Sequence, residues 1–172
     1  MALLISFSGL PGAGKTTLAR RLAQQMRGIH VEIDQIEGAI RRNLKESLEE
    51  SDRYRAAYGV AKAQVESFLR SGHTIIVDGL NSIPATRDLW VKAATAADAD
   101  LIEVEVICSD HAAHRRRLVE RRDPHRIGTP RSFAIAKTYQ PWDRERVVID
   151  TATMSVEEAV ARIREAITAP LS

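Results

Sequence analysis

The chain has 172 residues, of which 44% are hydrophobic and 28% are charged, and its formal net charge is +2. These values are typical of a soluble globular protein, and so small a charge argues against a general nucleic-acid binder. The single cysteine, Cys108, excludes an internal disulfide and a cysteine-based zinc cluster, so a reducing, cytoplasmic location is expected.

Short apolar runs alternate with amphipathic stretches, which predicts an α/β fold in which helices cover both faces of a parallel sheet. The predicted strands are residues 3–8, 29–33, 74–77, 101–108 and 146–149. The length fits one domain over residues 1–172. No apolar run reaches the roughly 20 residues of a membrane helix, so no membrane partner is expected.

The first strand leads directly into GLPGAGKT, residues 9–16, which matches the phosphate-binding pattern G-x-x-x-x-G-K-[ST] at every fixed position. Glycines let backbone N–H groups wrap around phosphate oxygens, and a helix beginning near Lys15 adds the positive end of its dipole. Lys15 is predicted to reach the β- and γ-phosphates of ATP as a catalytic charge, and the Thr16 hydroxyl to ligate Mg²⁺. The predicted nucleotide-binding residues are Gly9, Pro11, Gly12, Ala13, Gly14, Lys15, Thr16 and Thr17.

An aspartate follows each of the next two strands, where open α/β sheets place their ligand sites. Asp34 follows residues 29–33 and is predicted to be a catalytic, substrate-binding base that accepts the proton of an attacking hydroxyl. Asp78 follows residues 74–77 and is predicted to hold Mg²⁺, directly or through water. Either aspartate could instead cap the helix after its strand.

The loop, Asp34 and Asp78 together resemble the small-molecule P-loop kinases. This group includes shikimate, gluconate and adenylylsulfate kinases, chloramphenicol phosphotransferase, zeta toxins and the kinase domain of polynucleotide kinase. Its members place a catalytic or substrate-binding aspartate just after the second strand, where Asp34 falls. Uncharacterised kinase-like ATP-binding proteins of the group have segments similar to DGLN at 78–81, Arg87, Trp90, YQPW at 139–142 and VIDT at 148–151. The resemblance implies a P-loop NTPase three-layer sandwich with a five-stranded parallel sheet, nucleoside-monophosphate-kinase-like, with a lid segment.

The fourth strand and the helix after it are rich in charge. Glu103 and Glu105 alternate with apolar residues, and we expect both to point to solvent. Arg117 and Arg121 stand four apart, on one helix face. They resemble the R-x-x-x-R of kinase lids, which implies that they are catalytic and clamp the phosphates. A solvated charged face, or the equally spaced pair Arg122 and Arg126, would explain the pattern as well.

The last part of the chain contains one irregular segment and one helix. Residues 123–140 show little apolar periodicity and contain two prolines, so a mobile lid is predicted there. Apolar residues at helical spacing predict a helix over 156–167, with Ser155 and Glu158 as its N-terminal capping box.

These features predict an ATP-dependent phosphotransferase that moves the γ-phosphoryl group of Mg-ATP to a hydroxyl of a small-molecule acceptor. Arg41 and Arg87 are candidates to hold an anionic part of that acceptor. The expected partners are therefore ATP and the small-molecule acceptor, and nucleic acid enters only through the alternative of a polynucleotide kinase. A nucleoside monophosphate kinase, a polynucleotide 5′-end kinase and a slow nucleotide-switch ATPase remain as alternatives.

Overall fold

The computed structural model describes residues 2–44, 48–120 and 138–168. Its centre is a five-stranded sheet in the order β2-β3-β1-β4-β5, with every neighbouring pair parallel. The strands are β1 (Leu3–Ser8), β2 (Ile29–Glu32), β3 (Thr74–Asp78), β4 (Asp100–Ile107) and β5 (Val147–Asp150). The predicted five-stranded parallel sheet is confirmed.

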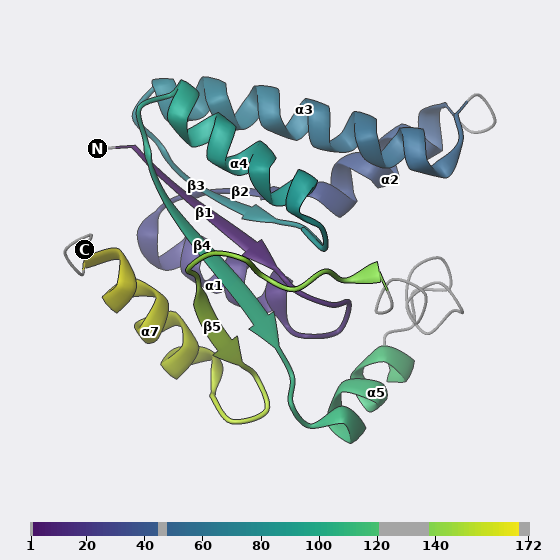
Figure 1. Ribbon diagram of the computed structural model, residues 1–172, viewed down its shortest axis with the longest axis vertical. Helices are drawn as coiled ribbons and strands as arrows, with labels where there is room; N and C mark the ends of the chain where they lie inside the picture. Colours follow the sequence, from purple (N-terminus) through teal and green to yellow (C-terminus); the bar gives the residue numbers. More distant parts are fainter. Residues whose placement is uncertain (1, 45–47, 121–137, 169–172) are drawn as a thin grey trace.

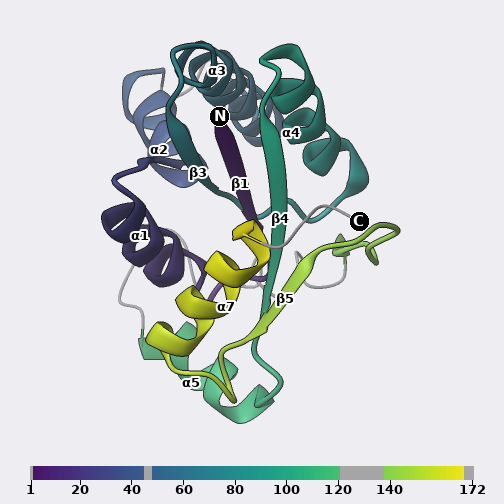
Figure 2. The ribbon, with the colours of Figure 1, turned by 90° about the vertical axis from the view of Figure 1, so that its left-hand side faces the viewer.

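Helices cover both faces of this sheet, as Figures 1 and 2 show. One face carries α1 (Lys15–Met26) and α7 (Val156–Thr168). The opposite face carries α2 (Ile33–Asn43), α3 (Glu50–Arg70) and α4 (Pro84–Ala96). A further helix, α5 (His111–Glu120), follows β4 beyond the carboxyl end of the sheet. The predicted three-layer α/β arrangement is confirmed.

The central strand β1 supplies both hydrophobic cores, because successive side chains of a strand point to opposite faces. Leu4 packs into the core under α3 and α4, whereas Ile5 and Phe7 pack into the core under α1 and α7. All three side chains are fully buried, and each such burial contributes about 1.5–3 kcal/mol. The carboxyl end of β1, where the phosphate-binding loop begins, is therefore held rigidly between two packed layers.

The capping box predicted for the last helix is present. The carboxylate of Glu158 accepts a hydrogen bond from the Ser155 backbone N–H at 2.8 Å, and the Ser155 hydroxyl accepts one from the Glu158 N–H at 3.2 Å. The backbone and hydroxyl hydrogen bonds from Ser155 lower the pKa of Glu158 below its ordinary value. Residues 2–44, 48–120 and 138–168 contain no helix long and apolar enough to cross a bilayer.

The expectation that Glu103 and Glu105 point to solvent was wrong. Each is only 8% exposed. Arg144 binds both oxygens of Glu103, at 2.5 and 2.8 Å, and Arg146 binds Glu105 at 2.9 Å. The chain preceding β5 supplies these arginines, and this covering segment could not be read from the alternation of β4 itself.

Most of the predicted lid, residues 123–140, lies outside the described residues. Its end is described and is fixed to the core. The Gln140 N–H donates to the Ser82 carbonyl at 2.8 Å, and the Tyr139 hydroxyl donates to Glu105 at 3.0 Å. The last residues of the predicted lid are therefore attached to the core, and the lid itself stays a prediction.

Candidate functional site

The phosphate-binding loop lies where the sequence places it, between β1 and α1. Gly12 and Gly14 adopt φ angles of +80° and +105°, which side chains with a Cβ rarely tolerate. Lys15 Nζ donates to the carbonyls of Gly9 and Leu10, at 2.8 and 3.0 Å. The ammonium group therefore lies against the loop backbone, next to the N-terminus of α1. This arrangement concentrates positive charge where phosphate oxygens would bind.

Neighbouring elements hold the loop by close backbone contacts. A Cβ on Gly9 would lie 2.1 Å from the Val106 carbonyl oxygen of β4, so no larger residue fits there. On the other side, His114 of α5 donates from Nε2 to the Pro11 carbonyl at 2.7 Å. Leu118 of the same helix would lie 2.8 Å from a Cβ on Gly12. The loop is thus packed between β4 and α5.

Asp78 ends β3 and is 4% exposed. Burial by itself would raise its pKa, but the neighbouring His30, Lys15 and Thr16 side chains together bring the pKa below its ordinary value. Asp78 is therefore a carboxylate at neutral pH, adjacent to the lysine and threonine of the loop. Such an oxygen donor beside Thr16 fits the Mg²⁺ site that the sequence predicts.

Asp34 does not simply follow a strand, because α2 begins at Ile33 and places Asp34 in its first turn. The carboxylate is close enough to the buried Tyr58 of α3 to affect it. Burial raises the pKa of Tyr58, the hydrogen bond from the Asn81 N–H at 3.2 Å lowers it, and the charges of Asp34 and Asp78 raise it further. The net shift is upward, so Tyr58 is neutral. The charges of both Asp34 and Asp78 therefore act on the buried Tyr58 hydroxyl.

Sequence reasoning missed Tyr58 as a site residue. Its position matches the apolar periodicity of α3, and that pattern predicts only a core residue. Only the fold reveals that its hydroxyl reaches the loop after β3, since a Cβ on Gly79 would lie 3.4 Å from it.

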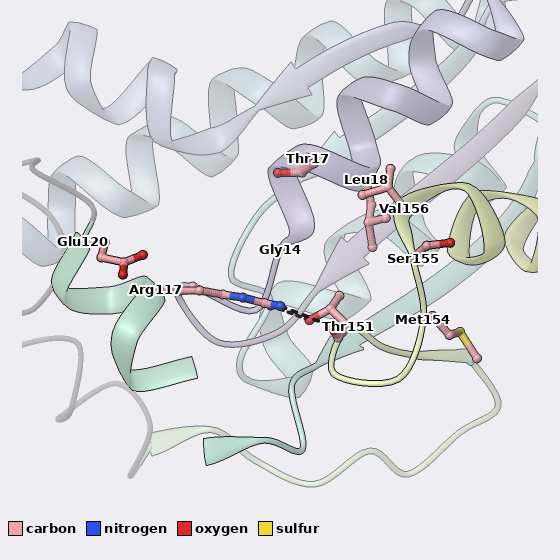
Figure 3. Close-up of a pocket in the computed structure, with 10 residues that line it drawn as sticks. Gly14, Thr17, Leu18, Arg117, Glu120, Thr151, Met154, Ser155 and Val156 are labelled. Atoms are coloured by element: carbon pink, nitrogen blue, oxygen red, sulfur yellow. Dashed lines mark hydrogen bonds between the residues drawn. The ribbon is translucent and has the colours of Figure 1, made fainter. Parts of the chain in front are cut away.

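A pocket of about 470 Å³ opens on the far side of the loop, between α5 and the start of α7 (Figure 3). Arg117 crosses it and donates to the Thr151 hydroxyl at 2.8 Å and to the Thr151 carbonyl at 3.1 Å. Thr151 in turn donates to the Ala13 carbonyl of the loop at 2.8 Å. The pocket is lined by Gly12, Gly14, Thr17, Leu18, Arg117, Glu120, Thr151, Met154, Ser155 and Val156. The volume and mixed lining suit a small aromatic group.

The other predicted arginines are not described beside this pocket. Arg121 lies outside the described residues, so its pairing with Arg117 stays a prediction. Arg41 lies in the last turn of α2 and is not among the described residues that line the pocket.

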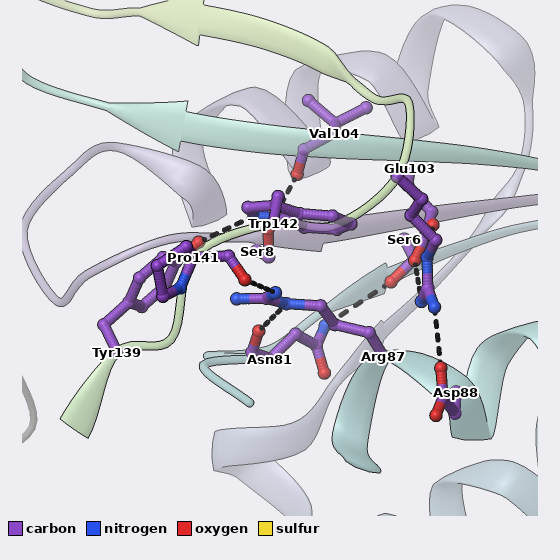
Figure 4. Close-up of polar contacts among 11 residues, drawn as sticks. Ser6, Ser8, Asn81, Arg87, Asp88, Glu103, Val104, Tyr139, Pro141 and Trp142 are labelled. Atoms are coloured by element: carbon purple, nitrogen blue, oxygen red, sulfur yellow. Dashed lines mark hydrogen bonds and ion pairs between the residues drawn. The ribbon is translucent and has the colours of Figure 1, made fainter. Parts of the chain in front are cut away.

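Arg87 does not have the acceptor-binding position predicted for it. It is 1% exposed, and its guanidinium donates to the carbonyls of Asn81 at 2.9 Å and Pro141 at 3.0 Å (Figure 4). It also donates to the carbonyls of Ser82 at 3.3 Å and Gln140 at 2.6 Å. A side chain so enclosed cannot contact an acceptor. Arg87 instead fixes the segment after the predicted lid to the loop after β3.

Asn81, which belongs to the same DGLN…R-x-x-W segment as Arg87, is buried and has a φ of +43°. Its amide nitrogen donates to the Phe7 carbonyl at 2.8 Å, and its amide oxygen accepts from the Trp90 indole at 3.0 Å. Its backbone contacts Tyr58 and Arg87. The residues that carry the D-x-x-N…R-x-x-W resemblance therefore fix the geometry around Asp78 from within the core.

Comparison with known proteins adds a family to this geometry. A profile of the AAA domain family matches residues 4–142. The adenylyl-sulfate kinase of Synechococcus sp. (strain JA-3-3Ab) is 27% identical over 165 residues, which cover 94% of this chain and 91% of that protein. The adenylyl-sulfate kinase of Oceanobacillus iheyensis is 29% identical over 170 residues, which cover 91% of this chain and 79% of that protein.

Solved structures share the fold at lower identity. A proposed kinase from Chloroflexus aurantiacus has a TM-score of 0.76 at 19% identity, covering 95% of this chain and 97% of that chain. The APS kinase of Mycobacterium tuberculosis, solved in complex with AMPPNP and APS, has a TM-score of 0.68 at 19% identity, covering 98% of both chains. With the family match over most of its length, this chain belongs to the AAA domain family.

Proposed function

We propose that the protein transfers the γ-phosphoryl group of ATP to a hydroxyl of a small molecule. The observation that carries this proposal is that Asp78 lies beside Lys15 and Thr16 of the loop, while the charges of Asp78 and of a second carboxylate, Asp34, both act on the buried Tyr58. A nucleotide-binding loop needs no second carboxylate beside its metal ligand, whereas transfer to a hydroxyl needs a group that accepts a proton.

ATP would lie along the loop, with its base in the 470 Å³ pocket and its phosphates at the N-terminus of α1. Arg117 would lie beside the base or the phosphates, since it forms one wall of that pocket. Lys15 would hold the β- and γ-phosphates while its charge offsets the charge that spreads over the transferring oxygens.

Thr16 and Asp78 would hold Mg²⁺. They fit the ion because both offer hard oxygen donors, and because Asp78 is ionised and has a buried oxygen, Oδ2, without a hydrogen-bond partner among the described residues. When bound, the ion would neutralise charge on the β- and γ-phosphate oxygens.

Asp34 would accept the proton of the acceptor hydroxyl while the hydroxyl oxygen forms a bond to the γ-phosphorus. At the same time the bond from that phosphorus to the bridging oxygen of ADP breaks. Tyr58, neutral and fixed by the Asn81 N–H, would orient the Asp34 side chain. The two curated relatives are adenylyl-sulfate kinases, so adenylyl sulfate is the first acceptor to test.

An acceptor panel tests this proposal. ADP release and phosphorylated product would be measured with adenylyl sulfate, sugars, nucleosides, nucleoside monophosphates and short oligonucleotides, for the native chain and for Asp34→Asn. The proposal expects a hydroxyl acceptor whose phosphorylation collapses in Asp34→Asn. Activity on a phosphate acceptor that survives Asp34→Asn would instead indicate a nucleoside monophosphate kinase, and ADP release independent of every acceptor would indicate a slow ATPase.

A further inference from the structure

Two buried polar atoms near the proposed site lack hydrogen-bond partners within the described part of the chain: His30 Nε2 and Asp78 Oδ2. Their separation is 3.7 Å, which is too long for a hydrogen bond. Buried polar groups are nearly always paired, because an unpaired one keeps the full cost of its desolvation. At this separation the two atoms form an ion pair when His30 is protonated, and when the imidazole is neutral they offer two ligand atoms to a bound cation.

A third ligand group lies beside this pair. Glu32 is two residues after His30 on β2, so both side chains lie on the same face of the sheet. Glu32 is also the register partner of Asp78 across the β2–β3 pair. One ligand atom from each of His30, Glu32 and Asp78 lies within 4.8 Å of the other two. The sheet therefore gathers one imidazole and two carboxylates at a single point.

The spacing matches a metal ion better than a hydrogen bond. Two ligands at about 2.1 Å from a tetrahedral ion are about 3.4 Å apart. The observed 3.7 Å between His30 Nε2 and Asp78 Oδ2 needs only a small adjustment to reach that value. Two carboxylates and a neutral imidazole also balance the charge of a divalent ion.

A path from solvent reaches the group. β2 is an edge strand, and an open groove of about 440 Å³ along it is lined in part by His30, Glu32 and Arg20. Arg20 donates to one carboxylate oxygen of Glu32, at 2.9 Å, and a carboxylate has a second oxygen that can bind a cation. Three protein ligands with a groove beside them leave a fourth position for water.

We propose that His30, Glu32 and Asp78 form a binding site for a divalent transition-metal ion of the Zn²⁺ class, next to the nucleotide site and sharing Asp78 with it. The imidazole selects against Mg²⁺, which takes oxygen ligands, and favours Zn²⁺ or Co²⁺. Binding of this ion does not depend on phosphotransfer. Where the proposed kinase activity holds, an ion here competes with Mg²⁺ for the Asp78 carboxylate, so Zn²⁺ inhibits transfer.

Co²⁺ tests the site, because its visible absorption reports four-coordinate binding directly. Chelator-treated, nucleotide-free protein would be titrated with Co²⁺ in excess Mg²⁺, for the native chain and for His30→Ala, His30→Gln and Glu32→Gln. His73→Ala is the matched control, since His73 is exposed and lies at the opposite end of β3 from Asp78. Thermal melts would identify any variant that fails to fold.

One equivalent of four-coordinate Co²⁺ is expected in the native chain and in His73→Ala. Affinity should fall at least about tenfold in the His30 and Glu32 variants, since even groups that only support a metal ligand change affinity by 10–100-fold. Equal Co²⁺ affinity in folded Glu32→Gln and His30→Gln, or a six-coordinate spectrum in the native chain, would overturn the proposal. No ATP or acceptor is present, so these outcomes are independent of the proposed kinase activity.

Discussion

The guanidinium carbon of Arg87 lies 4.1 Å from the ring centroid of Trp142, while its nitrogens donate to backbone carbonyls on both sides. One buried cation therefore joins α4, the loop after β3 and the segment that leads into β5 (Figure 4). The loop after β3 borders the phosphate-binding loop directly, because the Leu80 carbonyl accepts the Gly9 N–H at 3.2 Å. The stability of the fold and the geometry of the site depend on the same contact.

Arg87→Ala should lower the free energy of unfolding by about 3–5 kcal/mol, because four carbonyls, one buried and three partly buried, lose their donor and a cavity opens beside Trp142. Urea denaturation measures this change. Arg55→Ala is the control, since the Arg55 side chain is 82% exposed, and it should change the value by less than about 0.5 kcal/mol. Equal effects of the two substitutions would show that the Arg87 contacts contribute little.

The sequence predicted the sheet and the loop because both depend on local patterns. Apolar runs end where strands end, and the G-x-x-x-x-G-K-[ST] spacing matches one backbone conformation. It failed for Arg87, Glu103 and Tyr58, whose roles depend on which distant segment packs against them. From the sequence alone, a charged residue inside a helix is interpreted as a ligand-binding or solvent-exposed group, because the backbone carbonyls that surround it are known only from the fold. The cluster of His30, Glu32 and Asp78 could not be predicted for the same reason, because Asp78 lies next to the other two only through the β2–β3 pairing.

Lys15→Ala should reduce kcat for the acceptor found in the panel by more than about a thousandfold. Its ammonium group lies on the loop carbonyls of Gly9 and Leu10, next to the position proposed for the γ-phosphate. Initial rates of ADP formation measure this effect, and a melting temperature close to that of the native chain separates it from unfolding. Turnover near the native rate in a folded Lys15→Ala protein would contradict the role proposed for the loop.

Asp34→Asn should lower kcat by about 10²–10⁴ while the affinity for ATP changes little, because only the proton acceptor is lost. Steady-state kinetics with both substrates varied distinguish these parameters. Asp34 lies in the first turn of α2, where a carboxylate also stabilises the helix dipole. A lower melting temperature with kcat intact would therefore assign Asp34 to helix stabilisation alone.

Acid should destabilise the region around α5 through Asp110 and Asp150. Hydrogen bonds from the Ala113 and Ala112 N–H groups lower the pKa of Asp110, and hydrogen bonds from Ser109 lower the pKa of Asp150. Because both folded pKa values lie below the unfolded ones, this stabilisation is present above the unfolded pKa and is lost as pH falls through the folded pKa.

Thermal melts from neutral pH down to about pH 3 measure the effect, which should flatten in the double variant Asp110→Asn, Asp150→Asn. Asp98→Asn, at the end of α4, is the matched control. An unchanged acid dependence in the double variant would show that these carboxylates do not set it.

Arg117→Ala should weaken ATP binding by about tenfold, because it removes one cationic wall of the 470 Å³ pocket and the two hydrogen bonds that hold Thr151 over the loop. Thr151 also donates to the Ala13 carbonyl, so its loosening reaches the phosphate-binding backbone. Calorimetric titration of a non-hydrolysable ATP analogue with Mg²⁺ measures the affinity. Arg116→Ala removes the same charge from the exposed neighbouring position on α5 and should leave affinity within about twofold. Equal weakening by both substitutions would indicate a general effect of charge, whereas a loss confined to Arg117→Ala would support nucleotide binding beside this pocket.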